Sequence, residues 1–400
     1  MSKWIACTVQ DLVDQRQAEV KTGPFGTQLH ASDYVKDGIP VINVRNIGLG
    51  DIRPEKLEFI SEKTAQRLSS HLLKPNDIVF GRKGAVERHA FIRKAHDRWF
   101  QGSDCLRLRI SGETVDPRFV SYCCLTEAHK SWMMNQCSHG ATMASLNQDI
   151  VKRIPLTLPP LETQHKIASI LSAYDDLIEN NTRRIKILEE MAQSLYRERF
   201  VNFRFPGHDE VKMVDSLLGM VPEGWAVATV GQIIRRVSAG KKYENKTVSP
   251  TGEVPVLDQG KSGVIGYHND EAGIIASELN PIIVFANHTC YQRLIHFPFS
   301  AIQNVLPFLP ARENQRSIYW LHWATKDLIQ FNDYKGHWPE FIGKELLLPD
   351  TKTANIFEKY VRSIVQLIWK LEVKNQNLRQ TRDLLLPKLI SGEINVQGVD

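Results

Sequence analysis

The chain has 400 residues, of which 42% are hydrophobic and 24% are charged, and its formal net charge is +5. This length and composition suffice for two domains with separate cores, and they exclude an intrinsically disordered chain. The mildly positive charge permits a nucleic-acid partner without requiring one.

The N-terminus and the cysteines indicate the compartment. The first ten residues have no basic stretch followed by an apolar core, so they do not form a secretory signal. No apolar run approaches the roughly 20 residues that span a bilayer. The six cysteines form no CxxC motif and no disulfide framework. We therefore expect reduced thiols, a cytoplasmic location and no membrane segment.

Two modules of related sequence are predicted. WIACTVQDLV begins at Trp4 and WAVATVGQII at Trp225, while GIPVI at 38–42 resembles GEVPVL at 252–257. β-Branched residues bounded by glycine, proline or aspartate predict short strands in the last two stretches. Further strands are expected at Asp77 to Phe80 and Ile282 to Ala286, and helices at Pro117 to Gln136 and Ser317 to Phe331.

A long helix is predicted after Leu158-Pro159. Its apolar residues recur at alternating steps of four and three, which is typical of a coiled-coil seam. The predicted seam residues are Ile167, Leu171, Tyr174, Ile178, Asn181, Ile185, Leu188, Ala192 and Leu195.

The same register returns after Leu348-Pro349, at a shift of 190 residues. Its seam residues are Phe357, Val361, Ile364, Ile368, Leu371, Asn375, Leu378 and Leu385. Arg382 is a weak seam residue, so we expect the second helix to fray or become exposed near its end. An amphipathic helix usually packs on its own domain. Two helices that share register and length are nevertheless each other's obvious partners.

These patterns predict an α+β fold with an internal repeat. Arg204 to Gly224 is rich in turn residues and is interpreted as a linker. The expected segments are a module at 1–157, a helix at 158–203, a linker at 204–220, a module at 221–347, and a helix with its tail at 348–400.

No catalytic constellation is found in the sequence. Ser238 to Lys242 lacks the first glycine and the hydroxyl residue of a phosphate-binding loop, and there is no HExxH motif. Cys137-Ser138-His139 and His288-Thr289-Cys290 are lone pairs without a second half at zinc-ligand spacing. Glu372 and Lys374 can be fitted to a nuclease pattern, but a solvated helix face is the better interpretation.

The densest basic stretch runs from Gly81 to Ile110. Arg82 and Lys83 lie in a glycine-flanked turn, where a basic side chain can reach phosphates or base edges, and Arg88 follows. Arg107 and Arg109 alternate with leucines and are better explained as part of a half-exposed strand.

Other loop residues are candidate DNA contacts, because amide and basic side chains can bond base edges, although each can equally well cap a turn. In the first module they are Lys21, Thr22, Phe25, Gln28, Asn43, Arg45 and Asn46. In the second module they are Lys241, Lys242, Gln259, Lys261, Asn287, His288, Gln303, Asn304, Lys335, His337 and Trp338.

The stretch from Gly140 to Phe200 carries a family resemblance. Its glycine-led turn, Leu-Pro-Pro-Leu, Gln164 and the following apolar ladder resemble the central conserved region of type I restriction-modification specificity subunits. LRQTRDLLLPKLISGEI at 378–394 is similar to the distal conserved region of that family. The resemblance covers nearly the whole chain in family order, and the two modules correspond to the variable target-recognition domains.

The resemblance implies a non-catalytic subunit. Each recognition domain would read one half of an asymmetric, bipartite site in double-stranded DNA. The two helices would pack antiparallel, act as a spacer and bind two modification subunits that use S-adenosylmethionine. Two motor-nuclease restriction subunits would supply cleavage with ATP and Mg²⁺, so no cofactor is expected on this chain.

Two alternatives remain open at this point. One is the recognition subunit of a fused methylase-nuclease system. The other is a coiled-coil interaction protein with no role on DNA, which predicts no salt-dependent DNA binding.

Overall fold

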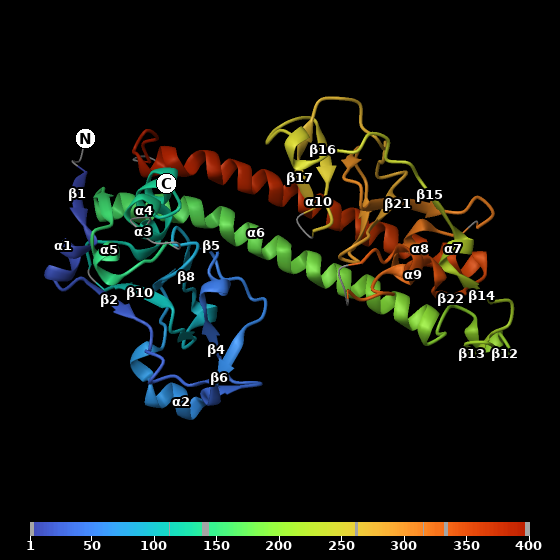
Figure 1. The fold of residues 1–400 in the computed structure, drawn as a ribbon, viewed down its shortest axis with the longest axis horizontal. Helices are drawn as coiled ribbons and strands as arrows, with labels where there is room; N and C mark the ends of the chain where they lie inside the picture. The colour runs from blue at the N-terminus through green and yellow to red at the C-terminus, as the bar shows by residue number, and fades with distance from the viewer. Residues whose placement is uncertain are drawn as a thin grey trace. The chain divides into compact units, whose positions relative to one another are not determined.

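The computed structural model describes residues 4–111, 113–137, 144–260, 263–314, 316–331 and 335–396. Lys261, Ser138, His139 and the glycine-led turn at Gly140, named above, lie outside these ranges. The chain forms two compact units: Met1–Glu179 with Gln376–Asp400, and Asn180–Asn375. The long helices α6 (Leu161–Tyr196) and α10 (Thr351–Ile390) each contribute residues to both units (Figure 1).

Unit 1 contains two main sheets. The first has the order β2 (Ala18–Thr22), β10 (Cys105–Ile110), β7 (Ile78–Gly81), β8 (His89–Phe91) and β5 (Leu49–Gly50). The second has the order β3 (Tyr34–Val35), β6 (Glu58–Ile60), β4 (Ile39–Ile42) and β9 (Phe100–Gln101). A separate pair joins β1 (Ile5–Thr8) to β11 (Pro155–Leu158). The helices are α1 (Val9–Asp14), α2 (Glu62–Arg67), α3 (Pro117–Cys123), α4 (Glu127–Cys137) and α5 (Gln148–Lys152).

Unit 2 repeats this plan. Its sheets have the orders β15 (Ile234–Arg236), β21 (Val305–Pro310), β18 (Ile282–Ala286), β19 (Gln292–Ile295), and β17 (Val264–His268), β16 (Val254–Leu257), β20 (Ser300–Ala301). The pair β14 (Ala226–Thr229) and β22 (Glu345–Leu348) corresponds to β1 and β11. The helices are α7 (Val230–Ile233), α8 (Ile318–Thr325) and α9 (Trp338–Gly343).

The predicted internal repeat is visible in these topologies. In both units a six-residue strand, β10 or β21, is the second strand of its sheet and lies between two antiparallel neighbours. The matched threonines Thr8 and Thr229 both begin a short helix as N-caps with a capping box. Such a cap satisfies backbone N–H groups that the first helical turn leaves without partners. The shared sequence therefore fixes the same local turn twice.

Several sequence-based boundaries change in the structure. The helix expected at 117–136 is two helices, α3 and α4, and the one expected at 317–331 ends at Thr325. Within the expected linker, β12 (Met213–Ser216) and β13 (Gly219–Pro222) form an antiparallel hairpin. The strands expected near residues 77 and 282 are confirmed as β7 and β18.

The two long helices run antiparallel within each unit, which confirms the expected coiled-coil pairing. In unit 2, Asn181 Nδ2 donates to Asn375 Oδ1 at 2.9 Å, and both side chains are buried. Closer to the start of α10, Phe357 contacts the ring of Tyr196 near the end of α6. The predicted seam side chains are all buried or half-buried. Buried asparagine pairs cost stability but penalise any other register.

The end of α10 belongs to unit 1 and does not fray. Leu386 and Leu389 are buried in one core with Ile167 and Leu171 of α6. Arg382 donates to Asp175 Oδ1 at 2.6 Å, and Tyr122 of α3 donates to Asp175 Oδ2 at 2.6 Å. The expectation of an exposed helix end was therefore wrong, because the arginine satisfies a carboxylate on the opposite helix.

Gln164 fastens the first module to α6. Its side chain is buried, accepts a hydrogen bond from the Asp116 N–H at 2.9 Å, and donates to the carbonyls of Thr114 and Pro159. All polar atoms of the amide therefore have partners, as burial requires. Among the described residues, no helix is both long and apolar enough to span a membrane.

Candidate nucleic-acid interface

Loops from distant parts of unit 1 meet at one edge of its five-stranded sheet. Antiparallel pairing places the end of β2, the start of β10 and the end of β7 at this edge. We call residues 22–28, 43–46, 82–84, 102–104 and 144–148 the first loop cluster. Backbone bonds join it: Arg82 N–H to Asp104, Gly102 N–H to Ile42, and Leu146 N–H to Arg82.

Two glycines allow the loops to approach this closely. A Cβ on Gly23 would lie 2.0 Å from the carbonyl oxygen of Gly102. A Cβ on Gly102 would lie 2.6 Å from the carbonyl oxygen of Ile42, which precedes Asn43. No side chain fits in either space, so the sequence keeps three loops in direct backbone contact.

The candidate DNA contacts in this cluster differ in their exposure and in their ion-pair partners. Lys83 is exposed and makes a 3.6 Å ion pair with Asp104, while Arg45 pairs with Glu58 at 2.7 Å. Exposed ion pairs contribute little stability, so phosphates can replace these carboxylates at low cost. Arg88 is half-buried and pairs with Glu87.

The cluster also contains polar residues that the sequence did not single out. Gln148 Nε2 donates to Thr22 Oγ1 at 2.7 Å, and Ser145 forms a backbone bridge with Lys83. Lys21, which was a predicted contact, is half-buried, and its carbonyl accepts a hydrogen bond from Gln101 Nε2. In the sequence, three polar residues in the run Ser145-Leu146-Asn147-Gln148 could have indicated these contacts. Only the tertiary fold brings it beside residues 22 and 83.

Unit 2 forms an equivalent second loop cluster from residues 258–260, 287–289, 302–304 and 335–338. The end of β18 and the start of β21 lie at this edge, with Ala286 opposite Val305. Gln259 Oε1 accepts from the His288 N–H at 2.8 Å, and the Trp338 N–H donates to Asn287 Oδ1 at 2.9 Å. The Asn287 N–H donates to the carbonyl of Asn304.

The remaining candidates in unit 2 lie around this cluster. Gln303 and Lys335 are exposed, and Lys242 is exposed beside its backbone bridge partner Ala301. Lys241 instead bonds Asp270 at 2.9 Å. The Trp338 ring packs against Phe341 with centroids 5.4 Å apart.

Two predicted contacts are corrected by the structure. Asn46 is fully buried and its amide donates to the carbonyls of Arg53 and Glu55, so it holds a turn together. His337 is also fully buried, with its N–H bonded to the Asn287 carbonyl. Neither side chain can reach a DNA surface in this conformation.

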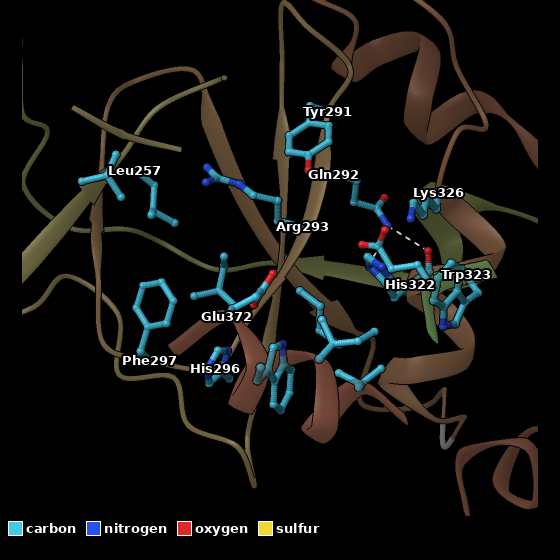
Figure 2. Close-up of a pocket in the computed structure, with 17 residues that line it drawn as sticks. Leu257, Tyr291, Gln292, Arg293, His296, Phe297, His322, Trp323, Lys326 and Glu372 are labelled. Carbon is cyan, nitrogen blue, oxygen red and sulfur yellow. Dashed lines mark hydrogen bonds between the residues drawn. The ribbon is translucent and has the colours of Figure 1, made fainter. Parts of the chain in front are cut away.

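Glu372 is exposed on α10, which agrees with the expected solvated helix face. It lines a cavity of about 280 Å³ in unit 2, together with Glu189 of α6 and the aromatic pair His296 and Trp369, whose ring centroids are 4.2 Å apart (Figure 2). Burial, and then repulsion by Glu189, raise the pKa of Glu372 to about 7. Arg293 also lines the cavity and donates to the carbonyl of Asp258.

We expect this carboxyl to make unit 2 less stable as pH rises. The pKa of Glu372 is about 7 in the folded protein and 4.5 for a glutamate in water, so folding favours the protonated form. The contribution of this carboxyl to the stability of unit 2 is therefore complete below pH 4.5, declines between pH 4.5 and 7, and stays low above pH 7. Glu372→Gln should flatten this decline and raise the melting temperature at pH 8. The gain should be modest, because the side chain keeps access to solvent.

Glu190→Gln is the matched control, because Glu190 is exposed on α6 beside Lys186. Thermal melts of the three proteins between pH 5 and 8.5 provide the measurement. Equal pH profiles for the wild type and Glu372→Gln would contradict the assignment.

Comparison with known proteins agrees with this arrangement. Residues 18–190 match the family model described as type I restriction modification DNA specificity domain. This match places a DNA specificity domain in the first part of the chain. Among the described residues, no group of three or more His, Cys, Asp or Glu side chains could hold a metal ion.

The similar proteins are specificity subunits of type I restriction enzymes. The MjaIX specificity subunit of Methanocaldococcus jannaschii is 25% identical over 66% of this chain and 66% of its own length. The HindI specificity subunit of Haemophilus influenzae is 22% identical over 88% of this chain and 94% of its own length. An S subunit structure from M. genitalium shares the fold, with a TM-score of 0.58, 18% identity and coverage of 97% and 96%. Residues 18–190 thus match the DNA specificity domain of type I restriction-modification systems, and the chain is similar to the specificity subunits of these systems over most of its length.

Proposed function

We propose that this chain is the sequence-specific DNA-binding subunit of a type I restriction-modification complex. Each loop cluster reads one half of an asymmetric, bipartite site in double-stranded DNA. Helices α6 and α10 set the gap between the half-sites and bind two modification subunits. Two restriction subunits complete the complex in the cytoplasm.

The proposal gives this chain no catalysis of its own. S-adenosylmethionine, ATP and Mg²⁺ belong to the partner subunits. The recognition domains are assigned to residues 1–157 and 221–347, the conserved helices to 158–203 and 348–400, and the linker to 204–220.

One observation carries the proposal: equivalent sheet edges in the two units present different polar loops. Unit 1 offers Arg82, Lys83 and Asn43, and unit 2 offers Gln259, Asn287 and His288. Arginine and lysine match guanine edges, and amides match adenine edges. Equivalent frames with different side chains suit two different half-sequences.

The test is DNA binding by the chain purified with the modification subunits of its own system. Methylation mapping in cells first supplies both half-sites and the gap. Arg82→Ala/Lys83→Ala should weaken binding at least tenfold. The slope of log affinity against log salt should fall by about 0.9 for each phosphate that the variant no longer neutralises. Titrations at several salt concentrations measure both.

Lys63→Ala is the control, because Lys63 is exposed on α2 outside the first loop cluster. Lys335→Ala should weaken binding to the other half-site only. If the wild-type complex shows no salt-dependent, sequence-specific binding, the chain is an interaction protein without a DNA role and the proposal fails.

A further inference from the structure

Two phenylalanines differ from the other phenylalanines of the chain in their exposure. The chain has 16 phenylalanines, all within the described residues, and only Phe25 and Phe331 are exposed, at 64% and 51%. One belongs to each unit. Single exposed apolar residues are common on proteins. Here, however, one exposed phenylalanine lies at or beside the loop cluster of each unit, and this placement suggests a shared role.

Phe25 projects from a fixed turn. Its carbonyl accepts hydrogen bonds from the N–H groups of Gln28 at 2.8 Å and Leu29 at 3.2 Å. Pro24 and Leu29, on either side of it, are buried. Arg67 donates to the Gln28 carbonyl at 2.7 Å. The backbone that holds the ring is therefore already ordered, so little conformational entropy is lost when the ring is buried by a partner.

Phe331 is exposed beside the second loop cluster. Its ring centroid lies 6.3 Å from that of His337, which is buried and bonded through its N–H to Asn287. Phe331 reaches this position from the segment after α8, whereas Phe25 follows β2. Two unrelated segments thus bring an exposed phenyl ring to equivalent loop clusters.

We propose that Phe25 and Phe331 are apolar wedges, each of which enters a base step of the half-site read by its own unit. This inference rests on the proposed function. Apolar side chains that insert between base pairs unstack the step and kink the duplex. Nearby cations, Lys83 in unit 1 and Lys335 in unit 2, are available for the flanking phosphates.

The wedge adds a source of specificity that needs no hydrogen bond to a base. Pyrimidine–purine steps unstack most easily, so each wedge favours half-sites with such a step at its position. Burial of the ring against bases contributes affinity, and the deformation energy selects the sequence.

The experiment uses the complex with its modification subunits and duplexes carrying 2-aminopurine at successive positions of both half-sites. The methylated adenines are left unlabelled, because the partner acts on them. The wild type should raise the fluorescence several-fold at one step in each half-site. Phe25→Ala should abolish only the signal in the half-site of unit 1, and Phe331→Ala only the other. Each change should weaken binding about tenfold.

Three controls separate the outcomes. Leu217→Ala removes an equally apolar, 86% exposed side chain on the β12–β13 turn and should change nothing. Phe25→Leu keeps an apolar wedge and should retain part of the signal. Circular dichroism melts check that each variant is folded.

Specific binding by the wild type without any fluorescent step, or unchanged signals in the alanine variants, would overturn the wedges and leave the proposed function intact. Absence of specific binding by the wild type would instead overturn the proposed function, and the wedges with it.

Discussion

One additional heptad in each long helix is expected to widen the gap between the two DNA half-sites by about three base pairs. Seven helical residues add about 10 Å, and base pairs are stacked about 3.4 Å apart. The insertions would follow Glu179 in α6 and Asn375 in α10, at the boundaries between the units. Neither loop cluster is altered, so both half-sequences should stay the same. Methylation mapping in cells that carry the variant measures the gap directly.

The control for this experiment is a heptad inserted into α6 alone. Its extra seam residues have no counterparts on α10, so it should destabilise the protein instead of defining a new gap. Methylation by the double insertion at the original spacing would show that the helices do not set the distance.

Loss of the Arg382 side chain is expected to destabilise unit 1 by about 2 to 3 kcal/mol. Asp175 is only 17% exposed, and Arg382→Met would leave its carboxylate without a cation, although the Tyr122 hydroxyl still donates to it. An uncompensated charge in a poorly solvated place costs more than the pair contributes when intact. Urea denaturation followed by circular dichroism gives the change in unfolding free energy.

A second substitution that restores stability shows whether the loss comes from the unpaired charge or from packing. Asp175→Asn combined with Arg382→Met removes both charges and should recover most of the lost stability. Arg379→Ala, on the exposed side of α10, should have little effect. Wild-type stability of Arg382→Met would refute the role assigned to this pair.

The long helices were predictable because their pattern is local and repeated. Ile167, Leu171, Phe357 and Val361 recur at heptad spacing, and all four are buried. Strands β7 and β18 were also predictable, since each is a short apolar run bounded by turn residues. In these elements the chemistry of neighbouring residues is enough to define the structure.

The site was only partly predictable, because a polar residue in a loop looks the same whether it faces solvent or the interior. Asn46 bonds two carbonyls that lie seven and nine residues further along the chain, and no local pattern marks that bend. Glu372 occupies an ordinary surface position on its helix, and Glu189 faces it only through tertiary packing. Gln148 meets Thr22 across 126 residues of sequence.

The discontinuity of unit 1 has a consequence for the order in which the protein is made. Unit 2 is a single stretch that ends at Asn375, whereas unit 1 includes residues after that point. Leu386, Leu389 and Val396 belong to the core of unit 1, and Gly392 lies against Trp4 near the other end of the chain. During synthesis on the ribosome, the unit that begins first is therefore completed last. A premature stop after Asn375 would spare the later unit and leave the earlier one with an open core.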